Sequence, residues 1–280
     1  MAKPSTNAGA SISPQGDAKP GNYISEWFGY RVFPVVSNAP QMIEFQERRQ
    51  CPFLSASTGE PRECIKSESS KGVCTISSVT SERRDEWLVC PYRAVEGDLL
   101  EPATRRLFAV RPSCGVVIAS APSLQKPEVR TSIVGALEEG KRAFVFFQDK
   151  LGGEISLPRT ERSPELSFDI TLVEIIAKEE TFGIGQYGIL EIQTMDFHGT
   201  YKHAVQNLTD ALRLHKQEFP TALSTHQEWL SEHVEGPNLA NVFKRTFTRW
   251  YSNFRWAWIN RVQVVYLQSQ PRFGRAGNDT

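Results

Sequence analysis

The chain has no apolar run near the roughly 18 residues that a membrane-spanning helix needs, and its start lacks the apolar stretch of a signal peptide. Neither charge is in excess, because 32 Lys and Arg are set against 32 Asp and Glu in 280 residues. Overall charge therefore gives no indication of a nucleic-acid partner, and any such function must depend on local features. We expect a soluble cytoplasmic protein with no membrane partner.

Cysteine is scarce. The chain has five cysteines, an odd number, and no export signal accompanies them, so free thiols or metal ligands are expected in place of a disulfide framework. Four lie in the first third of the chain, where short apolar pieces alternate with Gly, Pro and Ser: Cys51, Cys64, Cys74 and Cys90. A small irregular domain of this kind needs an additional stabilising link, such as a bound metal ion. Their spacing lacks paired C-x₂-C knuckles, however, and a buried cysteine is often only a small hydrophobic residue.

Several enzyme signatures are also missing. The sequence has no H-E-x-x-H or H-x-E…C-x-x-C zinc pattern, no G-x-S-x-G elbow and no Walker A loop. A G-x-G-x-x-G run occurs at residues 183–188, but it leads into a predicted strand, whereas a dinucleotide fingerprint opens a helix. His198 and His203 are expected only to cap or pack the following helix.

The chain divides into segments of different composition. Residues 1–22 are rich in Pro, Gly, Ser, Ala and Asn without periodicity, which predicts a disordered arm. Residues 23–95 hold the four cysteines. From residue 96 onward, apolar strands alternate with helix-like stretches, which predicts a mixed α/β domain. The clearest of these are strands at 115–118 and 143–147 and helices at 132–142 and 201–219.

The densest chemical pattern lies between residues 164 and 193. Two strands and a glycine-bearing turn between them are predicted at residues 167–172, 187–194 and 181–186. Asp169 would point away from the apolar face of the first strand, and Glu191 and Gln193 would share one face of the second. A hairpin would bring these side chains together, and two carboxylates on rigid strands can bind Mg²⁺. Isolated acids on half-exposed strands are more often solvated surface residues.

These residues resemble the active-site region of the NotI-type restriction endonucleases. That family is a branch of the PD-(D/E)XK nucleases in which glutamine replaces the usual lysine. The matching blocks lie at residues 51–54, 71–74, 87–91, 150–154, 164–169, 187–199 and 235–247. The similarity runs in order from about Ile24 to Phe247.

The resemblance implies a homodimeric, Mg²⁺-dependent type II restriction endonuclease that cuts double-stranded DNA at a long GC-rich palindrome. A cognate DNA methyltransferase would act on the same site without direct contact, in the bacterial cytoplasm. Asp169 and Glu191 would bind Mg²⁺, Gln193 would orient water or a phosphate oxygen, and Glu154 would be a third acid. The implied fold is α/β, a PD-(D/E)XK nuclease-like mixed sheet flanked by helices at residues 96–249.

The resemblance also gives the cysteines a role. Four positions match the cysteines that hold a single iron in the family, which implies a Cys₄ metal-binding domain ahead of the nuclease core: Cys51, Cys64, Cys74 and Cys90. A tetrahedral thiolate site takes Fe or Zn, and a closed shell of four sulfurs makes the ion structural. Cys114 falls outside the matching blocks and is expected to pack.

After about Arg249 the resemblance stops, and residues 250–280 are expected to be a divergent or truncated basic tail. Asn238 is a candidate cap for a helix whose apolar stripe would hold Leu239, Val242, Phe243 and Phe247, with Lys244 and Arg245 facing outward. The basic residues toward this end are Lys244, Arg245, Arg249, Arg255, Arg261, Arg272 and Arg275. The alternative function is a catalytically impaired DNA-binding relative that keeps a structural Cys₄ metal.

Overall fold

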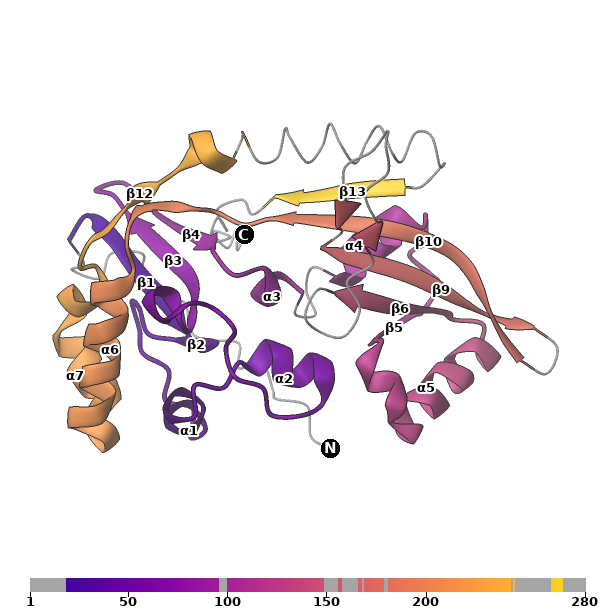
Figure 1. Cartoon of the computed structure of the whole chain (residues 1–280), viewed down its shortest axis with the longest axis horizontal. Helices are drawn as coiled ribbons and strands as arrows, with labels where there is room; N and C mark the ends of the chain where they lie inside the picture. The colour runs from indigo at the N-terminus through magenta and orange to yellow at the C-terminus, as the bar shows by residue number, and fades with distance from the viewer. Residues whose placement is uncertain are drawn as a thin grey trace, which may run out of the picture.

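The computed structural model describes residues 19–95, 100–148, 156–157, 166–167, 169–178, 181–242, 244 and 263–268. These residues form a mixed α/β protein with two main sheets and helices packed around them, which confirms the predicted α/β class (Figure 1). No helix within these ranges is long and apolar enough to cross a membrane.

The amino-terminal sheet is antiparallel throughout, with strand order β2-β1-β3-β4. Its strands are β1 (Gly21–Trp27), β2 (Tyr30–Arg31), β3 (Val73–Val79) and β4 (Arg84–Leu88). Short helices surround it: α1 (Met42–Glu47), α2 (Pro52–Thr58), η1 (Glu68–Ser70) and α3 (Pro91–Ala94). Because β1 begins at Gly21, it takes in the last two residues of the predicted arm, and residues 1–18 lie outside the described residues.

The second sheet has five strands in the order β13-β10-β9-β6-β5. They are β5 (Val116–Ser120), β6 (Arg142–Gln148), β9 (Ile170–Lys178), β10 (Thr181–Gln193) and β13 (Gln263–Gln268). The inner pairs are antiparallel and the two outer pairs parallel. The short strands β7 (Ser156–Leu157) and β8 (Leu166–Ser167) pair with each other.

Side chains of the second sheet alternate between two apolar layers, as the period of two requires. Phe144 and Phe146 of β6 join the main core, whereas Ala143 and Val145 pack with Ile133. The first layer includes helix α4 (Leu100–Leu107), and the second includes α5 (Pro127–Glu138), which connects β5 to β6. The predicted strands at 115–118 and 143–147 and the helix near 132–142 are confirmed, with shifted bounds.

The predicted turn at residues 181–186 is wrong, because β10 already begins at Thr181 and continues the pairing with β9. Its glycines do not reverse the chain. A Cβ on Gly183 would come within 2.7 Å of the Lys178 side chain, and one on Gly185 within 3.0 Å of Ile176. These glycines therefore permit close cross-strand packing inside a longer hairpin, which carries a register shift between Ile184 and Tyr187.

After β10 the chain crosses back to the amino-terminal sheet. The elements of this segment are β11 (Phe197–Gly199), α6 (Lys202–His215), η3 (Lys216–Glu218), α7 (Phe219–Thr225), η4 (Gln227–Leu230) and β12 (Val234–Pro237). Figure 1 shows α6 and α7 beside the amino-terminal sheet. The Phe219 and Trp27 rings lie 6.2 Å apart, and Gln227 donates a hydrogen bond to the Pro34 carbonyl over 3.1 Å. Sequence reasoning placed this segment with the nuclease core, but its helices pack against the other sheet.

The carboxy-terminal segment supplies an edge strand that sequence reasoning did not predict. β13 runs parallel to β10, with six residue pairs from Gly188↔Gln263 to Gln193↔Gln268 (Figure 1). Residues 250–262 and 269–280 of the predicted tail lie outside the described residues. The tail therefore belongs to the sheet at least over residues 263–268.

Ending the chain after residue 262 should destabilise the protein, because it removes β13 and uncovers the edge of β10. The ladder hydrogen bonds are worth about 1 kcal/mol each, so we expect the thermal midpoint to fall by on the order of 10 °C. Differential scanning fluorimetry compares this truncation with one ending after residue 269, which keeps β13 and should melt as the full chain does. Equal midpoints for both truncations would show that β13 contributes nothing.

Candidate functional site

The predicted catalytic residues lie at the end of the five-stranded sheet where β9 begins and where β6 and β10 finish. Ile170, at the start of β9, pairs with Leu190 of β10 on one side and with Gln148, the last residue of β6, on the other. Asp169 comes directly before β9, and Glu191 directly follows Leu190. The register therefore places Asp169 level with Glu191 across the hairpin.

A hydrogen bond fixes this arrangement. The backbone N–H of Ile192 donates to Oδ2 of Asp169 over 2.9 Å, which ties the carboxylate to the neighbouring strand. Asp169 is half-buried and Glu191 is only 2% exposed. Gln193, two residues further along β10, is half-buried and donates from Nε2 to the Thr194 carbonyl over 2.9 Å. The structure thus brings together Asp169, Glu191 and Gln193; Glu154 lies outside the described residues.

This edge of the sheet suits a hard divalent cation. A carboxylate buried as deeply as that of Glu191 is costly unless a positive charge or donors compensate it. Carboxylate and amide oxygens are ligands that Mg²⁺ accepts together with water and phosphate oxygens. The donor set of Asp169, Glu191 and Gln193 therefore fits the predicted ion, and its role in binding stays a prediction.

β13 extends the surface next to these residues. Tyr266 pairs with Glu191 and Gln268 with Gln193. The signal for this strand was present in the sequence, since residues 263–268 are rich in β-branched and aromatic residues. It was missed because no family block extends that far.

The four amino-terminal cysteines gather around one small cavity. All are buried and none is in a disulfide, and they line a space of about 10 Å³, which holds roughly one atom: Cys51, Cys64, Cys74 and Cys90. Their mutual approach depends on the fold, because Cys74 lies on β3 whereas the other three lie on loops and helix starts. Cys114 is half-buried and lies outside this cavity.

Two of these cysteines begin helices. Cys51 and Cys90 occupy the cap positions of α2 and α3, and a proline follows each of them. Backbone N–H groups at a helix start point toward a cap and favour negative charge there. The Gly72 N–H likewise points at the Cys64 sulfur over 3.4 Å. Such N–H groups stabilise thiolates, the form of cysteine that binds metal.

The electrostatics of the cluster agree with this. A hydrogen bond from Cys74 lowers the pKa of Cys90 to about 6, with help from the Lys66 ammonium and the backbone N–H groups of Arg93 and Tyr92. The same hydrogen bond, together with burial, raises the pKa of Cys74. Burial raises the pKa of Cys51 to about 12. The Cys90 sulfur is thus poised as a thiolate, and a bound cation would favour deprotonation of Cys51 and Cys74, whose pKa values are raised.

Lys66 is a residue of this cluster that sequence reasoning missed. Its ammonium donates to the Val73 carbonyl over 2.7 Å and to the Val89 carbonyl over 3.2 Å, one residue before Cys74 and Cys90 respectively. This position offsets part of the negative charge that four thiolates would carry. The sequence offered one indication of this role, because Lys66 lies only two residues after Cys64.

The cavity fits a thiolate-bound ion in donor type and in size. Within the described ranges, the one group of three or more His, Cys, Asp or Glu whose ligand atoms all lie within 4.8 Å of one another lies elsewhere, at residues 203, 232 and 233. The four sulfurs therefore do not form such a compact group in this structure, and binding an ion would require them to move closer together. Fe or Zn at this position stays a prediction.

The predicted helix after β12 is confirmed in part. The Asn238 side chain accepts a hydrogen bond from the Asn241 N–H over 3.0 Å, as a cap does, and Val242 is buried. Leu239 is 47% exposed, so its place on the apolar stripe is wrong. Asn241 also donates to Asp196 over 2.7 Å, which ties this helix to the segment after β10.

No protein-family model matches this chain, and no curated protein matches it as a relative.

Proposed function

We propose that the protein is a Mg²⁺-dependent type II restriction endonuclease of the NotI type, which hydrolyses both strands of DNA at a long GC-rich palindrome. The observation that carries the proposal is the meeting of Asp169, Glu191 and Gln193 at one edge of the sheet, with Asp169 tied to the Ile192 N–H. These are the residues on which the sequence resembles the family's active site. The enzyme would act in the bacterial cytoplasm, where a methyltransferase protects the same sites.

In the proposed mechanism, Asp169 and Glu191 would hold Mg²⁺. The bound ion would supply Lewis-acid chemistry, polarising the scissile phosphate and lowering the pKa of a water that attacks in line. Gln193 orients that water or a phosphate oxygen through its amide. Because an amide neither takes a proton nor adds positive charge, more of the electrostatic stabilisation falls on the ion and its two carboxylates.

The proposed fold is a PD-(D/E)XK core preceded by a Cys₄ domain. The mixed sheet with a central β9–β10 hairpin, covered on its two faces by α4 and α5, supports the first part. The convergence of four buried thiols on one cavity supports the second. The Fe or Zn ion would stabilise the fold without contacting DNA, because four sulfur ligands leave no open position.

Cutting both strands of a palindrome with one active site per chain is most simply done by two chains related by a twofold axis. We therefore predict a homodimer on DNA, measured by light scattering of the complex with a duplex that contains the recognition sequence. Two chains per duplex and cleavage of both strands are expected. A complex of one chain per duplex that cuts only one strand would contradict the dimer. It would still be compatible with the proposed hydrolysis of a single phosphodiester bond by each chain.

The chain's neutral net charge favours one other function, a catalytically impaired DNA-binding relative. Incubation of the purified protein with GC-rich plasmid and Mg²⁺ separates the two. Discrete fragments support the endonuclease. DNA that is retarded on a gel but uncut supports the binding protein.

A further inference from the structure

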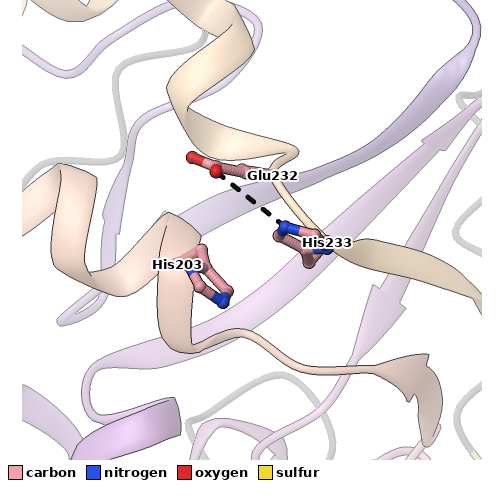
Figure 2. Close-up of side chains that lie close together, drawn as sticks. All are labelled: His203, Glu232 and His233. Atoms are coloured by element: carbon pink, nitrogen blue, oxygen red, sulfur yellow. Dashed lines mark ion pairs between the residues drawn. The ribbon is translucent and has the colours of Figure 1, made fainter.

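Three metal-binding side chains meet on the surface of the protein, far in sequence from the cysteines. His203 lies in the first turn of α6, and Glu232 and His233 lie in the turn between η4 and β12. One ligand atom from each lies within 4.8 Å of the others, and the two imidazole rings are 4.5 Å apart. Figure 2 shows the His203 ring next to that of His233, with the Glu232 carboxylate directed toward His233. His203 is exposed and follows Tyr201, the cap residue of α6, so the expectation that it only caps or packs this helix is wrong.

A hydrogen bond from Asn207 helps to hold Glu232 in this position. Asn207, one turn after His203 on α6, donates from Nδ2 to Oε2 of Glu232 over 2.7 Å. The other carboxylate oxygen, Oε1, lies 4.0 Å from Nε2 of His233. An amide that orients a ligating carboxylate through its second oxygen is a common feature of metal sites.

The backbone fixes His233 as well. His233 has a φ of +59°, a conformation that few residues other than glycine adopt. Its carbonyl accepts a hydrogen bond from the Thr200 N–H over 3.2 Å. A Cβ on Gly199 would come within 2.5 Å of that carbonyl oxygen, so the glycine allows β11 to approach this turn.

We propose that His203, Glu232 and His233 form a binding site for a divalent transition-metal ion of the Zn²⁺ class. Two imidazoles and one carboxylate are ligands for Zn²⁺, whereas Mg²⁺ prefers oxygen ligands alone. In a tetrahedral zinc site the ligand atoms lie about 3.3 Å apart, so small rotations of these exposed side chains would complete the shell. Three protein ligands leave a fourth position open to water or to an external ligand.

The ion would join α6 to the turn that enters β12. Both elements lie beside the amino-terminal sheet. At this point a hydrogen bond from Asn207 to Glu232 links them, and the three proposed ligands are exposed. The site is thus separate from the Cys₄ cavity and from the Asp169 and Glu191 edge, and it differs from both in ligand chemistry. It does not depend on the proposed nuclease activity.

The test is equilibrium dialysis of the full chain against Zn²⁺, after its cysteine site has been filled and the excess metal removed. One further Zn²⁺ per chain is expected. His203→Ala and His233→Ala should each weaken this binding at least tenfold, and Asn207→Ala, which loses only the orienting hydrogen bond, by about tenfold. The matched control is His226→Ala, which removes an exposed histidine beside another acid, Glu228, 3.0 Å away.

Circular dichroism of each variant checks that it is folded, and these exposed side chains should not affect folding. If a histidine variant fails to fold, Glu232→Gln provides the same test with a neutral side chain of equal size. The proposal is overturned if no further Zn²⁺ binds, or if His203→Ala and His226→Ala bind it equally well.

Discussion

We expect Asp169→Asn and Glu191→Gln each to slow DNA cleavage by at least about a hundredfold while specific DNA binding is retained. Each change removes a negative charge from the proposed Mg²⁺ site, and a metal ion supplies several kcal/mol to the transition state of phosphodiester hydrolysis. Neither change removes a cation that contacts phosphate. Both replacements keep the shape of the side chain, so in Asp169→Asn the new amide oxygen can still accept from the Ile192 N–H.

Cleavage rates on plasmid and fluorescence anisotropy without Mg²⁺ measure the two properties separately. The matched control is Asp210→Asn, which removes a carboxylate of α6 that accepts hydrogen bonds from the exposed side chains of Gln206 and Arg213. This variant should cut as the wild type does. Normal cutting by Asp169→Asn or Glu191→Gln would remove these residues from the active site.

We expect Cys64→Ser and Cys90→Ser each to lose the proposed Fe or Zn ion and to lower the thermal midpoint by on the order of 10 °C or more. The helices between residues 42 and 94, around the cysteines, have only three to seven residues, so we expect a structural ion to contribute a large share of the stability of this segment. Serine is nearly isosteric with cysteine but does not form the thiolate that binds iron or zinc. Cys114→Ser, outside the cavity, should keep both metal and midpoint.

Metal analysis and scanning calorimetry of the wild type and the three variants measure these effects. For wild-type protein purified without added zinc, we expect about one iron or zinc ion per chain, bound at the Cys₄ site. A wild type that is folded and fully stable without metal would contradict a structural role for the cysteines.

Local patterns predicted the elements that lie near the proposed active site. An apolar run predicts β6, and period-two alternation places Glu191 and Gln193 on one face of β10. The convergence of Asp169 with them followed from a hairpin, which is a local pairing. The exact turn did not follow, because Gly183 and Gly185 are compatible both with a turn and with close packing inside a strand.

Contacts between distant segments could not be predicted in this way. β13 pairs in parallel with β10 across some seventy residues, and parallel pairing leaves no local turn signal. The convergence of Cys51 and Cys90 depends on how α2 and α3 pack, and their spacing carries no information on that. The same holds for His203 and His233, which approach only because α6 and β12 return to the first sheet.

The most direct test of the account is to sequence the ends of DNA fragments produced from a GC-rich library with Mg²⁺. We predict that all ends derive from one palindromic sequence, cut at the same position in both strands, and that Asp169→Asn yields none. Ends without a common sequence, or fragments that Asp169→Asn produces equally well, would contradict the assignment of this chain as a site-specific endonuclease.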